Sequence, residues 1–179
     1  MAMSRHAPIR LLARFARDNR AVAALEFALV LPVLVLVLFG TVEIGNALLL
    51  DRKVTAAAQT AADLVAQQKS VTAGDIANIW RAIDNIIAPF DTGGTTYRLL
   101  SMVADEDANV TIDWQQRRGG TALENMSLPE GLATANESVI VAQITYSYVP
   151  VFGDLIFGSY DITDIAYLRP RTVEQVELR

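Results

Sequence analysis

An uncharged apolar stretch near the N-terminus constrains this chain more than any other feature. Residues 27–42 contain no formal charge, and the apolar character extends on both sides to cover residues 22–50. As an α-helix at 1.5 Å per residue, residues 22–50 would be about 43 Å long, which exceeds the ~30 Å hydrocarbon core of a bilayer. The two acids of the stretch, Glu26 and Glu43, would then lie near its two ends. The stretch predicts a helix that crosses a membrane once.

Charged residues are divided unevenly between the two sides of this stretch. Residues 1–20 contain five arginines against one aspartate, a formal charge of +4, whereas residues 51–179 carry −7 and the whole chain −5. Because basic flanks stay in the cytoplasm, we expect the N-terminus inside and the acidic part outside, in the periplasm of a Gram-negative cell. An acidic body also argues against nucleic-acid binding. The arginines that form this orientation signal are Arg5, Arg10, Arg14, Arg17 and Arg20.

Composition excludes several kinds of chemistry. The chain has no cysteine, which rules out disulfides, thiolate metal sites and cysteine nucleophiles. Its single histidine, His6, lies in the basic N-terminal segment, so no histidine is available for a catalytic triad in a folded domain. The sequence also has no glycine-rich phosphate loop. We therefore expect a protein that is not an enzyme and that holds no cofactor and no metal.

One acidic cluster has part of the spacing of a calcium-binding loop. Asp105, Asp107 and Asn109 have the first three ligand spacings of a calcium-binding loop. The glycine required at the sixth position is replaced by Val110, and the glutamate required at the twelfth by Gln116. The cluster is more typical of a solvated hairpin turn.

The region after the apolar stretch predicts a small α+β domain with a long helix leading into it. Residues 51–70 continue the helix, with a small-residue stripe at Ala57, Ala61 and Ala62 that would pack on the chain's own sheet or on a partner helix. Thr72 followed by Asp75 predicts the start of a second helix over residues 73–88. Strand patterns follow at residues 97–104, 109–115, 137–149 and 159–168, and predict three or four antiparallel strands.

The N-terminal region resembles a known family. Residues 17–32 place arginines and a short Ala/Val run before Glu26-Phe27-Ala28, followed by an apolar helix that contains Pro32. This opening is similar to that of TadE-like proteins, pseudopilins of the Tad (Flp-type) pilus machinery. Further similarity is found at Phe39-Gly40-x-x-Glu43-x-Gly45, in the alanine-rich helix, at Tyr146-Ser147-Tyr148-Val149-Pro150, and at Arg169-Pro170-Arg171.

The resemblance implies a processing site and a pairing role. A prepilin peptidase would cut five residues ahead of Glu26, between Ala21 and Val22, with Ala21 where the family commonly has glycine. The carboxylate of Glu26 would pair with the new α-amine of a neighbouring subunit, and Phe27 and Pro32 belong to the same pairing and recognition segment. The implied partners are other pilins and pseudopilins, inner-membrane Tad assembly proteins, the peptidase and membrane lipid. The globular part would resemble a pilin head.

These expectations divide the chain into four parts and leave alternatives open. The parts are a basic cytoplasmic leader (residues 1–21), a transmembrane helix (22–50), a helix extension (51–70) and an extracytoplasmic α+β domain (71–179). The expected function is that of a minor pilin-like component in the bacterial inner membrane or the pilus; the alternative is a bitopic scaffold that is never processed. A cleaved secretory signal fits less well, because Gly45-Asn46-Ala47, the nearest small-residue site, is followed by three leucines.

Overall fold

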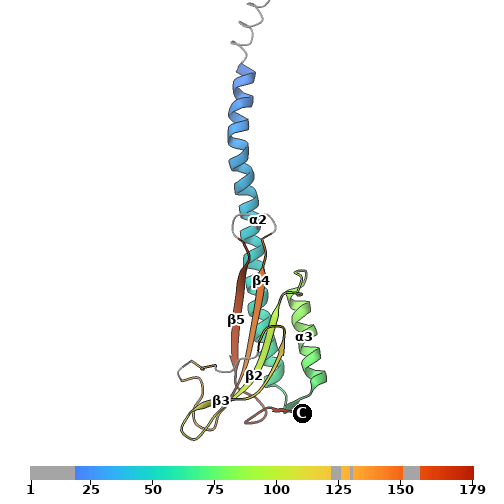
Figure 1. The fold of residues 1–179 in the computed structure, drawn as a ribbon, viewed down its shortest axis with the longest axis vertical. Coiled ribbons are helices and arrows are strands. Elements are labelled where there is room, and N and C mark those ends of the chain that lie inside the picture. Colours follow the sequence, from blue (N-terminus) through green and yellow to red (C-terminus); the bar gives the residue numbers. More distant parts are fainter. Residues whose placement is uncertain (1–18, 122–125, 130, 151–157) are drawn as a thin grey trace, which may run out of the picture. The chain divides into compact units, whose positions relative to one another are not determined.

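The computed structural model describes residues 19–121, 126–129, 131–150 and 158–179, without the side chains of residues 19–21. The chain divides into two compact units, Met1–Ile44 and Gly45–Arg179. The second unit, called the head below, contains the sheet and the second helix (Figure 1). The predicted α+β class, with a long apolar N-terminal helix, a second helix and an antiparallel sheet, is confirmed.

Helix α2 (Asn19–Ala66) is one continuous element of 48 residues. It covers the apolar stretch and the alanine-rich stretch without interruption, because residues 22–66 contain strong helix formers and only one proline, Pro32. The helix ends before a polar Gln-Gln-Lys sequence, where the backbone N–H of Gln68 donates to the carbonyl of Val65 at 3.0 Å and tightens the last turn. The end lies four residues before the predicted limit of the extension.

The head sheet has four strands, all antiparallel, in the order β3-β2-β4-β5. These are β2 (Thr96–Ala104), β3 (Val110–Arg118), β4 (Ser138–Tyr148) and β5 (Tyr160–Leu168). All four predicted strands are present. β3 extends three residues past its predicted end at residue 115, since the two arginines there continue the ladder, with Arg117 opposite Arg98 and Arg118 opposite Tyr97.

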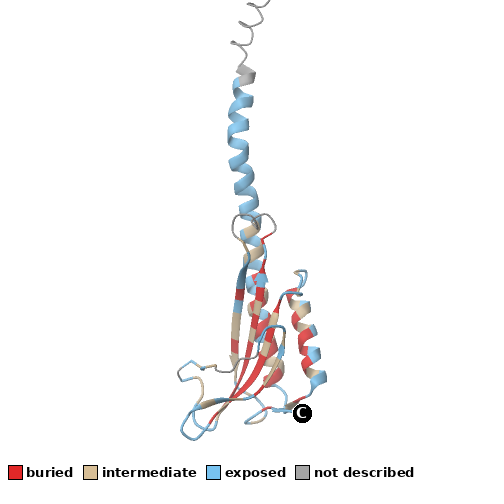
Figure 2. Ribbon diagram, viewed as in Figure 1, coloured by how far each residue is buried: buried red, intermediate tan, exposed pale blue. Residues whose placement is uncertain are grey.

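The small-residue face of α2 packs on this sheet, which confirms that interpretation of the stripe. Figure 2 shows buried residues on the part of α2 that lies beside the strands, and exposed residues along the rest of the helix. Alanine side chains end at Cβ, so the helix can approach the sheet closely. The buried α2 residues share one apolar cluster with Leu99, Ile140 and Ala142 of the sheet. Fully or almost fully buried on α2 are Leu50, Val54, Ala57, Ala58, Ala61, Ala62, Val65 and Ala66.

Helix α3 (Ala73–Ile87) begins at the predicted capping box. The hydroxyl of Thr72 accepts from the N–H of Asp75, and the carboxylate of Asp75 accepts from the N–H of Thr72 at 2.9 Å. At the other end of α3, the ammonium group of Lys53 on α2 donates to the carbonyls of Ile86 and Ala88, each at 2.7 Å. A cation at a helix C-terminus is stabilising, because it bonds carbonyls that have no partner in the helix and lies at the negative end of the helix dipole.

Two short strands form a pair that the sequence did not predict. β1 (Ser70–Val71) and β6 (Glu177–Leu178) pair in parallel. The C-terminal segment is fixed further by Trp114, whose indole N–H donates to the carbonyl of Val176 at 2.8 Å. Two-residue strands carry no detectable periodicity, so their pairing depends on the tertiary packing around them.

Enlarging a buried alanine of α2 tests the close packing of helix and sheet. We expect Ala58→Leu to lower the free energy of unfolding of the head by about 1–3 kcal/mol, because the added carbons have no space. Ala56 is exposed on the same helix, so Ala56→Leu is the matched control and should stay within about 0.5 kcal/mol of the natural chain. Denaturant unfolding of the full chain in detergent, followed by the fluorescence of Trp80 and Trp114, measures both. Equal stabilities of the two variants would contradict the packing.

Candidate functional site: the exposed apolar segment of helix α2

The N-terminal part of α2 exposes large apolar side chains on all sides. Its most apolar window has a mean hydropathy of 2.8, and none of that window is buried. At about 1.5–3 kcal/mol for each large apolar side chain left in water, this exposure would be very unfavourable in an aqueous solution. The exposed residues are Val22, Leu25, Phe27, Leu29, Val30, Leu31, Val33, Leu34, Val35, Leu36, Val37, Leu38, Phe39, Val42, Ile44, Leu48 and Leu49. We call residues 22–49 the apolar segment.

The length of the apolar segment fits a bilayer. Glu26 and Glu43 are seventeen positions apart, which corresponds to about 26 Å along a helix, and the next charged residue is Asp51. This separation is a little shorter than the ~30 Å hydrocarbon core of a bilayer, so a spanning helix would hold the two acids close to its two surfaces. The helix is long and apolar enough to cross a membrane.

Most backbone groups of the segment are paired within the helix, and the exception is the carbonyl of Ala28, which loses its usual donor at Pro32. The helix passes through Pro32, which lacks an N–H, and remains helical on both sides of it. The hydroxyl of Thr41 donates to the carbonyl of Val37 at 2.8 Å, so this polar side chain also has a partner inside the helix. A helix that crosses a bilayer must pair its backbone polar groups inside the protein, because the hydrocarbon core contains no water to bond them.

The structure brings only some of the predicted site residues onto one face. Val22 and Glu26 are four positions apart, so they lie on the same side of α2, about 6 Å apart along the axis, and both are exposed. Pro32 is about 240° around the helix from Glu26, and Phe27 is about 100° from it, so neither shares that face. The bond between Ala21 and Val22 lies in the first turn of α2.

The predicted orientation signal falls largely outside the described residues. Arg5, Arg10, Arg14 and Arg17 precede residue 19, and for Arg20 and Ala21 only the helical backbone is described. The arginine signal and the processing position therefore stay predictions from the sequence.

Within the head, the clearest electrostatic cluster joins α3 to the sheet. Both carboxylate oxygens of Asp84 accept from the guanidinium of Arg118, one of them at 2.8 Å, and the Tyr97 hydroxyl donates to Asp84 at 2.7 Å. The guanidinium also lies over the Tyr97 ring, 4.1 Å from its centroid. No local sequence pattern indicates this cluster, since its members come from α3, β2 and β3.

The cluster is held in one protonation state. Hydrogen bonds from Arg118 keep the pKa of Asp84 below its usual value, against the opposing effect of burial, and Tyr97 adds to the lowering. Burial raises the pKa of Tyr97, and so does its bond to the Asp84 anion. A fixed anion, a fixed cation and a neutral phenol contain no activated nucleophile and no poised base, so the cluster fits a structural role.

The acidic turn between β2 and β3 is explained by its own hydrogen bonds. One carboxylate oxygen of Asp105 accepts from the backbone N–H of Asp107 at 3.0 Å and of Asn109 at 2.7 Å, and the other accepts from the Asn109 side chain at 3.1 Å. These bonds lower the pKa of Asp105. The arrangement is that of a turn stabilised by an aspartate, as the hairpin interpretation predicted. Among the described residues no group of three or more potential metal-ligating side chains comes together.

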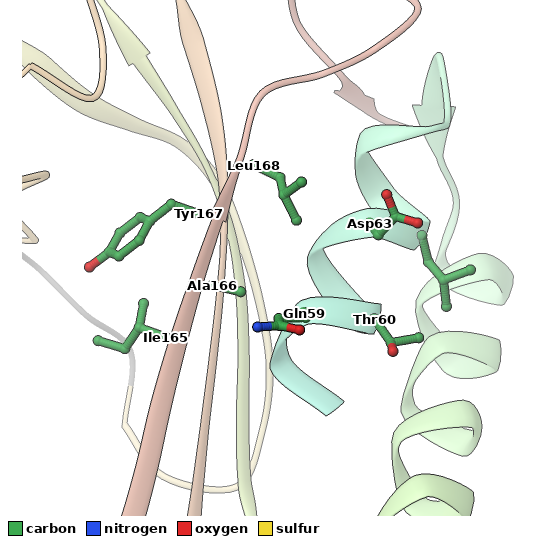
Figure 3. Close-up of a pocket in the computed structure, with 8 residues that line it drawn as sticks. Gln59, Thr60, Asp63, Ile165, Ala166, Tyr167 and Leu168 are labelled. Carbon is green, nitrogen blue, oxygen red and sulfur yellow. The ribbon is translucent and has the colours of Figure 1, made fainter. Parts of the chain in front are cut away.

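A groove of about 630 Å³ lies between α2 and the edge strand β5. In Figure 3, Ala166 and Leu168 point toward the helix, whereas Ile165 and Tyr167 point away from it. Asp63, on the helix side, forms an ion pair with Arg171. Nearby, the Asp164 carboxylate accepts from the backbone N–H of Ile165 at 2.7 Å and from a threonine hydroxyl of α2. The lining of the groove mixes polar residues of α2 with apolar residues of β5, its one acid is paired, and it offers no catalytic constellation.

Taken together, these features define a class of protein with one helix able to cross a membrane and an α+β head. Residues 21–63 match the family described as TadE-like protein. The match confirms the resemblance to TadE-like pseudopilins over the apolar segment and most of the α2 extension, and it supports a component related to the Tad pilus. No curated protein and no solved structure matches the chain.

Neutralising Asp84 tests the electrostatic cluster and its pH dependence. We expect Asp84→Asn to lower the free energy of unfolding by about 1–2 kcal/mol at pH 7, a modest value because the Arg118 side chain is 39 % exposed. The folded-state pKa of Asp84 is depressed, so its stabilisation is present above the unfolded value near 3.9 and is lost as pH falls through the folded value. The difference between variant and natural chain should therefore shrink below about pH 4.

Denaturant titrations of the full chain in detergent at several pH values measure this difference. Glu106→Gln is the control, since Glu106 is an exposed acid of the β2–β3 turn; it should match the natural chain at every pH. A stability gap for Asp84→Asn that stays constant down to pH 2.5 would contradict the assignment.

Proposed function

We propose that this chain is a single-pass, pilin-like component of a bacterial Tad-type pilus assembly apparatus, which acts through helix packing and protein contacts and not through catalysis. The observation that carries the proposal is that the family match and the exposed apolar segment occupy the same part of the chain. The TadE-like match at residues 21–63 covers the whole exposed apolar segment, which needs lipid or other apolar helices around it.

The proposed topology follows from the charge distribution. The arginines of residues 1–20 keep the N-terminus in the cytoplasm, and the acidic head lies on the periplasmic side of the inner membrane. In this arrangement Glu26 lies near the cytoplasmic surface and Glu43 near the periplasmic surface. A carboxylate carried deep into the bilayer would cost about 2–3 kcal/mol or more, which favours these surface positions until a partner is available.

Processing would change the electrostatics at the inner end of the helix. A cut between Ala21 and Val22 removes all five arginines and leaves an α-ammonium at Val22. Because Val22 and Glu26 share an exposed face, the new cation and the carboxylate of one subunit are both accessible to a neighbour. In a low dielectric the pairing of one subunit's amine with another's carboxylate would set the register between packed helices.

The first turn of α2 must open before the cut. Residues 21 and 22 are helical, whereas a peptidase site generally binds an extended strand. The first turn of a helix is held by few backbone hydrogen bonds and opens at low cost, so this requirement is compatible with processing.

The mature N-terminus tests the processing step. In cells that contain a prepilin peptidase, we expect mass spectrometry of the purified protein to find Val22 as its first residue. Ala21→Leu should leave the chain uncut because the larger side chain does not fit where a small one is required, and Ala21→Gly should be cut at least as fast as the natural chain. An intact Met1 in all three proteins would instead favour the alternative, a bitopic scaffold that stays unprocessed in the inner membrane.

Cross-linking tests the packing step. The chain has no cysteine, so a single Leu31→Cys or Ala28→Cys provides a unique attachment site for a photo-activated cross-linker. We expect capture of neighbouring pilin helices in assembling cells, and a clear loss of capture when Glu26→Gln is added. Glu106→Cys in the head turn is the matched control and should not capture those helices. Equal yields from the helix and control positions would contradict the proposal.

A further inference from the structure

One end of the head exposes apolar and aromatic side chains. Val149 follows the last residue of β4 and is 54 % exposed, and Tyr160, the first residue of β5, is 43 % exposed. Tyr160 packs edge-on against the buried Tyr148 with 5.4 Å between ring centroids, so its ring has a fixed position. Tyr160 therefore presents an exposed aromatic ring in a fixed position at the same end of the sheet as the exposed Val149.

The end of the sheet that holds Val149 and Tyr160 lies at the same height along α2 as the first residues of the head, which begins at Gly45. Strand β5 and α2 run in the same direction, because Asp164 contacts Thr55 and, farther along both elements, Arg171 contacts Asp63. Figure 1 shows β5 running beside α2 in the head. Tyr160 precedes Asp164 by four residues, about 13 Å along a strand, which corresponds to about nine residues of helix. Tyr160 is therefore level with residues near 46 of α2.

Helix α2 also exposes large apolar side chains close to the height of Tyr160. Leu48 is 58 % exposed and Leu49 is 48 % exposed, and both belong to the head unit. They are also the last residues of the apolar segment, so the surface that requires lipid continues along one helix into the head. We call Leu48, Leu49, Val149 and Tyr160 the apolar end of the head.

Charged side chains mark where this surface stops. Asp51 is the next charged residue along α2, and Asp161 is the next residue along β5; both are exposed. Asp161 accepts from the hydroxyl of Ser147 at 2.6 Å. An apolar surface edged by a tyrosine and then by carboxylates matches the order of chemistry across a membrane surface, from acyl chains through the headgroup level to water.

We propose that the apolar end of the head contacts the lipid surface, with the Tyr160 ring at the headgroup level. The inference rests on the proposed membrane topology and adds a second attachment beside the helix. Lipid is the occupant because the exposed apolar surface of α2 continues past Glu43, at the membrane surface, to Leu48 and Leu49, with no further charged residue before Asp51. With both the helix and the apolar end of the head in contact with lipid, the tilt of the head relative to the bilayer is restricted. The helix alone would leave that tilt free.

Spin-label accessibility of single-cysteine variants of the full chain tests the contact. Because the chain has no cysteine, each variant carries one nitroxide. Ser159→Cys reports on the apolar end and leaves Tyr160 in place, Leu36→Cys reports on the centre of the apolar segment, and Asp107→Cys reports on the turn between β2 and β3. Each is reconstituted at one copy per nanodisc of phosphatidylethanolamine and phosphatidylglycerol. Collision rates are measured with oxygen, which enters lipid, and with a water-soluble nickel chelate.

We expect the ratio of oxygen to nickel collisions at Ser159→Cys to be several-fold above that at Asp107→Cys and below that at Leu36→Cys. Adding Tyr160→Ser and Val149→Ser should move the ratio toward the aqueous value, whereas Tyr160→Phe should not. An aqueous ratio at Ser159→Cys with a lipid ratio at Leu36→Cys overturns the head contact and leaves the span intact. Low collision rates with both reagents indicate contact with protein and overturn it as well. An aqueous ratio at Leu36→Cys overturns the proposed topology itself.

Discussion

Helix α2 pairs most of its backbone polar groups within itself over 48 residues, with one bond lost at Pro32, and the rest of the structure depends on this. An element that pairs most of its own backbone can enter lipid in one part and pack on a sheet in another. What distinguishes the two parts is side-chain size. Residues 29–39 are mostly valine and leucine and present a large apolar surface on every side, whereas residues 57–62 are rich in alanine and let the sheet approach. The change occurs close to Leu50, the first fully buried residue of the helix.

Most of the secondary structure follows from local patterns, and the long-range contacts do not. The capping box at Thr72 and Asp75 defined the start of α3 because both partners lie within four residues. The four strands were recognisable from β-branched and aromatic residues. In contrast, the Lys53 bonds to the end of α3, and the bonds of Asp84 to Tyr97 and Arg118, join residues 13 to 35 positions apart. Nothing in the neighbouring sequence specifies such partners, and the same reason explains the missed β1–β6 pair.

The candidate site was predictable from the sequence for a different reason. Its chemistry is one acid, Glu26, on an apolar helix, and composition alone indicates such a helix. The described part of the chain adds that Val22 and Glu26 share an exposed face, and that Phe27 and Pro32 do not share it. A pairing role for Glu26 needs a second subunit to complete it. Hence no cavity or hydrogen-bond network within one chain can identify this kind of site, unlike a catalytic centre, which a single fold assembles.

The head has its own core, and this separates folding from membrane function. Its apolar cluster joins the buried face of α2 after residue 49 to α3 and the sheet, and contains no member from residues 22–46. Changes at Glu26 or Val22 therefore leave the packing of the head intact, so a loss of assembly in such variants would report on pairing and not on misfolding. The same separation explains how residues 27–42 can be free of charge and suited to lipid, because none of them belongs to the core of the head.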